Sequence, residues 1–271
     1  HNIKRRIAKM DAYFMKRFTT VRTGICEDEI LAVGPIEDID VDGIFTRPTI
    51  EGYVRAVNAL RNGKSPDILG VQAELLKVVV RDPTIRDKMY EMAMAVWDGG
   101  QMPAHWLESI GFAIWKRKTP KSDLKNWRMV NLIAHSSKVV SILLHWRMQK
   151  VARRVWSQSQ YGFRPGSWTM DAIFVVTRLM EEFRKTVDVG GPGEFEKYEQ
   201  TLYLMFEDYS QAFDGVQREL LWKVLRKVFR FPESIVRLLR SFHDGFVTYS
   251  TVNNLYGAGF VTKSGVRQGC V

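Results

Sequence analysis

An unbroken apolar run that ends in acidic residues is the feature that most constrains how this chain can fold. Residues 202–206 read LYLMF, and Glu207 and Asp208 follow directly. A run that is apolar at successive positions is typical of a strand covered on both faces. We therefore expect a buried strand over 202–208 in a layered sheet, with the carboxylates at the point where the chain leaves the sheet.

The acids of this stretch allow two interpretations. Asp208 and Asp214 can be turn and N-cap residues before the helix that follows, which is a common use of aspartate. They can also hold a metal, because a hard cation such as Mg²⁺ binds carboxylate and phosphate oxygens, and two such ions can assist phosphoryl transfer. Both interpretations stay open at this point.

Basic residues are concentrated in two parts of the chain. The net charge is +10, residues 1–22 carry seven Lys and Arg against one acid, and residues 101–154 carry eleven against two. A basic block of this kind is a candidate surface for phosphate groups. The alternative is a solvated charged face with no partner.

Composition excludes several classes of protein. No apolar run approaches the roughly 18 residues of a membrane span. The two cysteines, at opposite ends of the 271 residues, are too few for a disulfide framework, and the five histidines lack zinc-ligand spacing. We expect an intracellular protein, in the nucleus or cytoplasm and not secreted, that does not act at a membrane. The oligomeric state is not indicated.

Periodicity predicts a mixed α+β chain. Thr49 as N-cap, Glu51 in the first turn and Gly63 as the stop outline one helix. A hairpin is expected over 246–265, turning across Asn253-Asn254. A strand is expected over 110–118, a loop over 188–200, and helices over 4–18, 50–62, 71–80, 84–100, 131–155, 167–187, 216–229 and 232–242.

Five stretches in a fixed order carry a family resemblance. They are GKSPDILGVQAELLK (63–77), WKRKTPKSDLKNWRMVNLIAHSSKVVSILLHWRM (115–148), SQYGFRPGSWTMDAI (159–173), FEDYSQAFDGVQRELLWKVL (206–225) and KSGVRQGC (263–270). Together they resemble the reverse transcriptase domain of non-LTR retrotransposons.

The resemblance covers about residues 47–271. It implies a right-hand polymerase fold, with helical fingers, a partial palm that has a small antiparallel sheet, and no thumb. The expected parts are a basic helix and acidic linker (1–46), the fingers and start of the palm (47–187), a loop (188–200) and a partial palm (201–271).

The resemblance assigns the acids of the opening stretch different roles. Asp208 matches the catalytic aspartate that binds Mg²⁺ or Mn²⁺, with the Tyr209 carbonyl as a second contact. Phe213 matches the aromatic residue under the incoming sugar, whose ring leaves no room for a 2′-hydroxyl. Asp214 belongs to the family pattern, and we interpret it as holding the turn.

Cationic residues of the fingers are implied to contact phosphates. Arg128 matches an arginine that contacts the incoming triphosphate, for which a planar guanidinium is suited. Lys118 matches a nucleotide or template contact, with Lys116 and Arg117 in the same basic loop. The alternative for this loop is general attraction to the backbone of the template and primer.

Two further stretches are implied to lie along the substrates. Gln160, Phe163 and Arg164 match the motif along the template path. Gln268 and Gly269 match residues that pack at the nascent base pair, where glycine permits close approach of the backbone.

The chain also departs from the family pattern. It contains no Asp-Asp pair, and the family places its remaining metal carboxylates in an aromatic-x-Asp-Asp turn after the position of Val271. Met129 stands where proline is usual, which suggests sequence drift. We therefore expect an internal fragment that does not polymerise DNA by itself.

The leading functional hypothesis is a part of an RNA-directed DNA polymerase that uses an RNA template, a DNA primer and dNTPs. The alternatives are a non-catalytic nucleic-acid-binding protein, or a protein-interaction scaffold built on residues 49–109. The basic helix at the start is interpreted as a linker to an upstream domain.

Overall fold

The computed structural model describes residues 2–20, 27–32, 34–36, 40–188, 202–209, 212–267 and 269. It forms two compact units, one made of residues 1–151 and 211–271, the other of residues 152–210. No helix in these ranges is long and apolar enough to cross a membrane.

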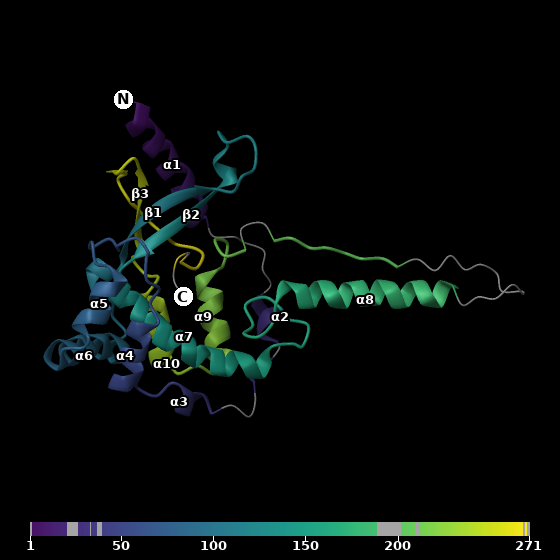
Figure 1. Ribbon diagram of the computed structural model, residues 1–271, viewed down its shortest axis with the longest axis horizontal. Helices are drawn as coiled ribbons and strands as arrows, with labels where there is room; N and C mark the ends of the chain where they lie inside the picture. The colour runs from purple at the N-terminus through teal and green to yellow at the C-terminus, as the bar shows by residue number, and fades with distance from the viewer. Residues whose placement is uncertain are drawn as a thin grey trace, which may run out of the picture. The chain divides into compact units, whose positions relative to one another are not determined.

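Most helices belong to the first unit, and local sequence signals define several of their ends. The Thr49 side chain accepts a hydrogen bond from the Gly52 N–H at 3.2 Å, and Gly100 ends a helix with a left-handed φ of 62°. The predicted N-cap at Thr49 is confirmed, but its helix ends at Asn58, before the predicted stop at Gly63. The helices are α1 (Asn2–Thr19), α2 (Glu27–Leu31), α3 (Val41–Ile44), α4 (Ile50–Asn58), α5 (Ala73–Val79), α6 (Pro83–Gly99), α7 (His135–Val155), α9 (Arg218–Lys227) and α10 (Glu233–Ser241), with 3-10 turns η1 (Ala104–Trp106) and η2 (Leu124–Asn126) (Figure 1).

Helix α7 begins at a side chain that is distant in sequence. The buried Asp67 carboxylate accepts hydrogen bonds from the backbone N–H of His135 at 2.7 Å, of Leu69 at 2.9 Å and of Val71 at 3.0 Å. Although burial raises it, these bonds bring the pKa of Asp67 below its ordinary value. Asp67 therefore joins the turn before α5 to the start of α7.

One mixed sheet lies in the first unit. Its strands are β1 (Glu108–Trp115), β2 (Trp127–Ile133), β3 (Val247–Val252), β4 (Leu255–Tyr256) and β5 (Phe260–Val261). The order is β2-β1-β3-β4, with β5 paired to β3. Strands β1 and β2 are antiparallel, but β1 and β3 are parallel. The expectation of an antiparallel sheet was wrong, because the long connection from β1 to β3 permits a parallel pair.

Strand β2 also corrects the predicted helix over 131–155. Residues Asn131–Ile133 complete the strand, and the helix begins only at His135. Strand β2 pairs with β1 along its whole length, from Trp127 opposite Trp115 to Ile133 opposite Ser109.

The predicted hairpin turn is confirmed. Asn253 and Asn254 have φ of 51° and 61° and join β3 to β4. Two positive φ values are what a two-residue turn between twisted strands requires, and asparagine tolerates them better than most residues.

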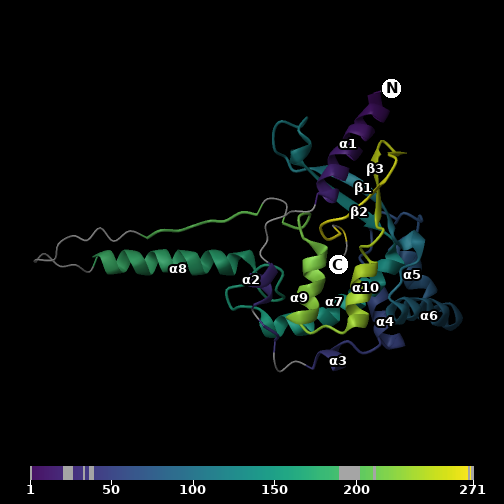
Figure 2. The same cartoon turned by 180° about the vertical axis from the view of Figure 1, so that it is seen from behind.

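Two hydrophobic clusters stabilise the first unit. The larger one joins α4, α5, α6, α7, α9 and α10 and includes the buried Trp97, Trp106 and Trp222. The smaller one packs Phe14 and Phe18 of α1 against Met129 and Phe260 of the sheet. Helix α1 lies against the sheet (Figures 1 and 2). Its buried side chains are therefore part of the core of the first unit.

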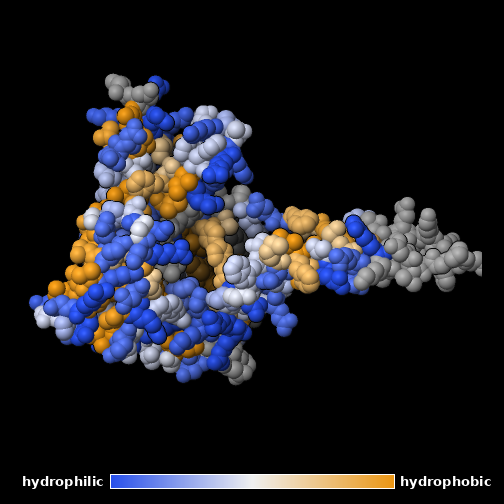
Figure 3. Space-filling model, in the orientation of Figure 1, coloured by the Kyte–Doolittle hydropathy of each residue, from blue (hydrophilic) through white to orange (hydrophobic). Residues whose placement is uncertain are grey.

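The second unit contains α8 (Thr169–Asp188) and the segment 202–209. Several apolar side chains of α8 are exposed, as the orange surface along this helix shows (Figure 3). The predicted loop over 188–200 lies outside the described residues, apart from Asp188 at the end of α8. Residues 202–209 adopt no regular secondary structure, and all of them are exposed.

The predicted buried strand over 202–208 is therefore wrong for this structure. Tyr203, Met205 and Phe206 are each more than 80% exposed. A strand needs backbone partners and a covering layer, and none of the five described strands pairs with this segment.

Candidate functional site

The predicted metal ligand, Asp208, lies in the exposed segment of the second unit, next to Glu207 and Tyr209. Its carboxylate has the hard oxygens that Mg²⁺ prefers. Within the described ranges, however, no three or more His, Cys, Asp and Glu side chains gather in a group that could hold a metal ion. The Asp208 carboxylate and the adjacent backbone carbonyl offer oxygen ligands for a cation, but they are too few to make a complete metal site.

The second predicted acid, Asp214, is in the first unit and is buried, with 2% of the residue exposed. Its carboxylate pairs with the guanidinium of Arg17 near the end of α1. Phe213, one residue earlier, is half-exposed at 49%. This arrangement supports the interpretation of Asp214 as a residue that holds the turn, beside an accessible aromatic ring.

The turn around Phe213 is interlocked with residues 264–266. The Val266 N–H donates to the Phe213 carbonyl at 3.0 Å, and the Gly265 N–H donates to the Val216 carbonyl at 2.9 Å. The single proton of the Ser264 hydroxyl is shared between the Asp214 carbonyl at 3.2 Å and the Phe18 carbonyl at 3.0 Å. Two stretches about 50 residues apart in sequence, both singled out by the family resemblance, therefore form one local structure.

Glycine is required at the centre of this interlock. Gly265 has a φ of 74°, and a Cβ atom there would lie 2.7 Å from the Cα of Asp214. Any residue other than glycine would be energetically costly here, because of the left-handed backbone and because of the close approach of Asp214.

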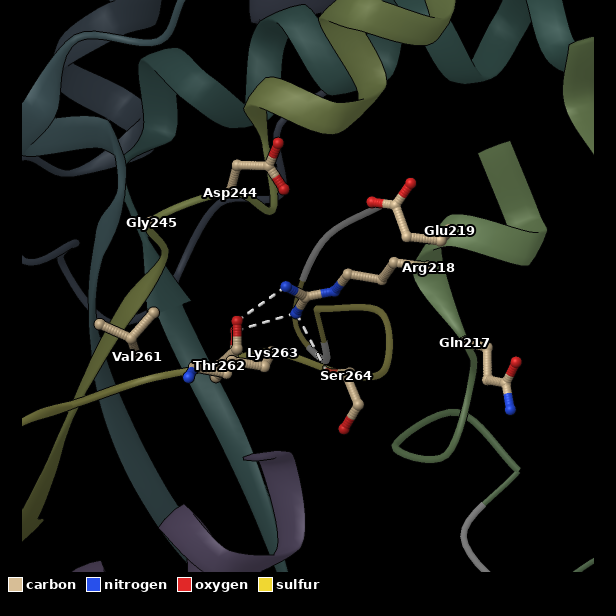
Figure 4. Close-up of a pocket in the computed structure, with 9 residues that line it drawn as sticks. All are labelled: Gln217, Arg218, Glu219, Asp244, Gly245, Val261, Thr262, Lys263 and Ser264. Atoms are coloured by element: carbon tan, nitrogen blue, oxygen red, sulfur yellow. Dashed lines mark hydrogen bonds between the residues drawn. The ribbon is translucent and has the colours of Figure 1, made fainter. Parts of the chain in front are cut away.

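Arg218, the first residue of α9, holds the same segment from another side (Figure 4). Its guanidinium donates to the carbonyls of Gly265 (2.7 Å), Thr262 (2.7 Å), Ser264 (3.1 Å) and His243 (3.1 Å), and to the Thr262 hydroxyl at 2.9 Å. Burial lowers the pKa of Arg218 to about 10, although the Asp244 carboxylate raises it; the charge of Arg267 lowers it further. The residue remains a cation at neutral pH and fixes the backbone of 262–265.

A pocket of about 310 Å³ opens beside Arg218. Glu219, Asp244 and Lys263 contribute charged side chains to its wall (Figure 4). His243 directly precedes Asp244, and its Nδ1–H donates to the Leu239 carbonyl at 2.9 Å. Burial, and then the charge of Arg267, lowers the pKa of His243 to about 3. The imidazole is therefore neutral at physiological pH.

The predicted phosphate-binding cations lie in the loop after β1 and on β2. Arg128 is exposed on β2 opposite Ile114, and Lys116 and Lys118 are exposed in the loop that follows β1. Hydrophilic side chains gather over this loop in Figure 3. Partial burial, followed by the charges of Arg17 and Arg128, lowers the pKa of Lys116, whereas Asp214 raises it. These four charges therefore lie close enough to influence one another.

The loop itself is ordered by local bonds. The Trp115 indole N–H donates to the Lys118 carbonyl at 2.8 Å, and the Lys116 amine donates to the Lys125 carbonyl at 3.2 Å. Arg117 has a left-handed φ of 59° and an exposed side chain.

Of the last two predicted nucleotide residues, Gln268 lies outside the described residues. Gly269 has a φ of 115°, and a Cβ atom there would overlap the carbonyl oxygen of Asn131. The segment therefore touches β2, the strand that carries Arg128. Arg267 is buried, with its guanidinium 4.8 Å from the ring centre of Phe242, so it has a packing role.

The predicted template residues form a group of their own in the second unit. The Gln160 side chain donates to the Gly162 carbonyl at 2.8 Å, and Arg164 donates to the Ser157 carbonyl at 3.2 Å. Phe163 is 87% exposed at a φ of 59°. Aromatic rings exposed in this way can stack on nucleic-acid bases.

Sequence reasoning missed Arg17 and Arg218. Each occurs in an amphipathic helix rich in basic residues, where most cations face solvent. The only available signal was the helix start at Gln217, which places Arg218 in the first turn, where a cation is unfavourable unless it has partners.

Comparison with known proteins identifies the class. Residues 118–271 match the family described as reverse transcriptase (RNA-dependent DNA polymerase). The match covers more than half of the chain, and the chain belongs to this family. The family predicted from the sequence is confirmed.

The relatives are transposon proteins. One is a probable RNA-directed DNA polymerase from transposon BS of Drosophila melanogaster, 26% identical over 226 residues, which are 82% of this chain and 23% of that protein. Another is the transposon TX1 uncharacterized 149 kDa protein of Xenopus laevis, 22% identical over 245 residues, which are 90% of this chain and 18% of that protein. The chain thus spans less than a quarter of the length of either relative. These similarities support a non-LTR retrotransposon reverse transcriptase and do not favour the non-catalytic alternative.

Proposed function

We propose that this chain is the nucleotide- and template-binding part of an RNA-directed DNA polymerase of a retrotransposon. The observation that carries the proposal is the interlock of the Phe213 turn with residues 264–266, close to the cations Lys116 and Arg128. An accessible aromatic ring beside a basic group suits a nucleoside triphosphate, which combines a sugar and base with a strongly anionic tail.

Each residue has a separate part in the proposed reaction. In that reaction the primer 3′-hydroxyl forms a bond to the α-phosphorus of a dNTP, and pyrophosphate leaves. Arg128 and Lys118 would bind the triphosphate oxygens, and Phe213 would fill the space of a 2′-hydroxyl. Gln268 and Gly269 would lie at the new base pair, and the loop with Lys116 and Arg117 at the nucleic-acid backbone.

Reverse transcriptases generally use divalent metal ions. We propose that Asp208 and the Tyr209 carbonyl would hold Mg²⁺ or Mn²⁺, which when bound neutralises phosphate oxygens and favours loss of the primer hydroxyl proton. Further carboxylates are needed for a second ion, and an Asp-Asp pair is absent from the sequence. The 271-residue chain is therefore proposed to bind substrates without polymerising.

For the template, we propose that Gln160, Phe163 and Arg164 contact the RNA strand. An arginine and an exposed aromatic ring can bind single-stranded nucleic acid by phosphate contact and base stacking without sequence preference.

Nucleotide binding tests this function directly. The chain is mixed with an RNA template, a DNA primer ending in a dideoxynucleotide, and labelled dATP or ATP with Mg²⁺, and retention is measured by filter binding. We expect tighter binding of dATP than of ATP, and a smaller difference for Phe213→Ala. Tyr256→Ala removes another exposed aromatic residue, on β4, and should leave the difference intact. Equal binding of dATP and ATP by the unaltered chain would contradict the assignment.

Primer extension tests the incomplete metal site. We expect no extension with the 271-residue chain, and activity with a C-terminally longer protein that is abolished by Asp208→Ala. Robust extension by the 271-residue chain would show that its metal site is complete.

A further inference from the structure

The end of α1 is built into the nucleotide site. The carbonyl of Phe18 accepts hydrogen bonds from the backbone N–H of Lys263 and of Ser264, both at 2.9 Å, and from the Ser264 hydroxyl at 3.0 Å. The Phe18 ring stacks on Phe260 with ring centres 6.2 Å apart. The last turn of α1 is thereby fixed to the segment that leads to Gly265.

Arg17 extends from the same turn to the other half of the interlock. Its guanidinium pairs with the carboxylate of Asp214, and only 8% and 2% of the two side chains are exposed. A buried charge is costly without a partner, so loss of either member leaves the other in an unfavourable environment. The position of Asp214 is therefore coupled to α1.

Phe213 precedes Asp214 directly, and its carbonyl accepts the bond from Val266. A shift of the Asp214 backbone would displace the Phe213 ring and loosen that bond at the same time. Both are features that the proposed function uses to select the nucleotide.

We propose that Arg17 is a positioning residue for nucleotide selection, which holds the Phe213 turn against Gly265 and Val266 by pairing with Asp214. The proposal rests on the proposed function of Phe213. It gives α1, which lies before the part of the chain that matches the family, a role in the fidelity of the site.

Amide hydrogen exchange tests the structural half. Arg17→Met should speed exchange of the Gly265 and Val266 amides by at least about tenfold, with α7 amides unchanged. Lys16→Met removes an equal charge from the exposed neighbouring position and should have no such effect. Arg17→Lys, which keeps the charge, should restore part of the protection. Unchanged exchange in Arg17→Met would overturn the proposal.

Nucleotide selection tests the functional half, in the same filter-binding assay with dATP and ATP. Arg17→Met should reduce the ratio of the two affinities, Lys16→Met should not, and Arg17→Lys should recover part of it. Asp214→Asn removes the other partner and should reproduce the Arg17→Met result. An unchanged ratio in both Arg17→Met and Asp214→Asn would overturn the proposal. Failure of the unaltered chain to prefer dATP would instead refute the proposed function, while the exchange data would still decide whether Arg17 holds the turn.

Discussion

Replacing Arg218 by methionine should destabilise the first unit by about 3 kcal/mol. Four backbone carbonyls, those of Thr262, Ser264, Gly265 and His243, lose a charged donor. At about 1.5 kcal/mol for each unsatisfied group, the loss is roughly 6 kcal/mol.

Part of that loss is offset, because methionine carries no charge to desolvate. The fall in the pKa of Arg218 from 12.5 to about 10 corresponds to roughly 3 kcal/mol of unfavourable burial that disappears with the guanidinium. The difference between these two estimates is the predicted change of about 3 kcal/mol.

Urea denaturation followed by tryptophan fluorescence measures the change, with an unaltered slope as the sign that the unfolded state is the same. Arg226→Met is the matched control, because Arg226 lies on the same helix and its contacts with Glu233 and the Trp222 carbonyl are long, at 3.4 Å each. It should cost less than about 1 kcal/mol. If Arg218→Met and Arg226→Met are equally stable, water from the adjacent pocket must satisfy the four carbonyls that Arg218 binds. That result would refute the predicted loss of about 3 kcal/mol.

Three further predictions concern stability. The pKa of His243 is about 3 in the folded chain and near its ordinary value of 6.5 in the unfolded chain, so stability should fall as the pH is lowered from 6.5 to 3. Urea denaturation at several pH values should show that His243→Gln weakens this pH dependence of stability. His105→Gln, at an exposed position, should leave it unchanged. Asp67→Asn should cost about 1–3 kcal/mol in urea denaturation, because an amide offers one acceptor oxygen to the three N–H groups that Asp67 now satisfies, and an unaltered midpoint would contradict this. Asn254→Val should lower the thermal midpoint, because a β-branched residue disfavours a φ of 61°, whereas Asn254→Gly should keep or raise it.

Local signals predicted much of the helical part of the fold. Thr49 and Gly100 define helix ends through bonds and conformations that involve only neighbouring residues, and Asn253-Asn254 defines a turn in the same way. Features of this kind can be read from sequence because their energies depend on a few adjacent positions.

Non-local features were not predictable in this way. The parallel pairing of β1 with β3 joins residues about 140 apart, and the sequence of either strand is compatible with both directions. The run at 202–208 is apolar enough for a covered strand, but covering depends on partner strands that its own residues do not determine. Arg17 and Asp214 became recognisable as a pair only when α1 and the turn were brought together.

The packing of α1 also affects how the chain acquires its structure during synthesis. Phe14 and Phe18 bury their rings against the sheet and Phe260, about 240 residues further along the chain. At roughly 5–20 residues per second, a ribosome needs on the order of 12 to 50 seconds to deliver that partner. For that interval a basic helix with an apolar face is exposed outside the ribosome. Until β5 has been synthesised, the apolar face of α1 therefore lacks the Phe260 ring that covers it in the folded unit.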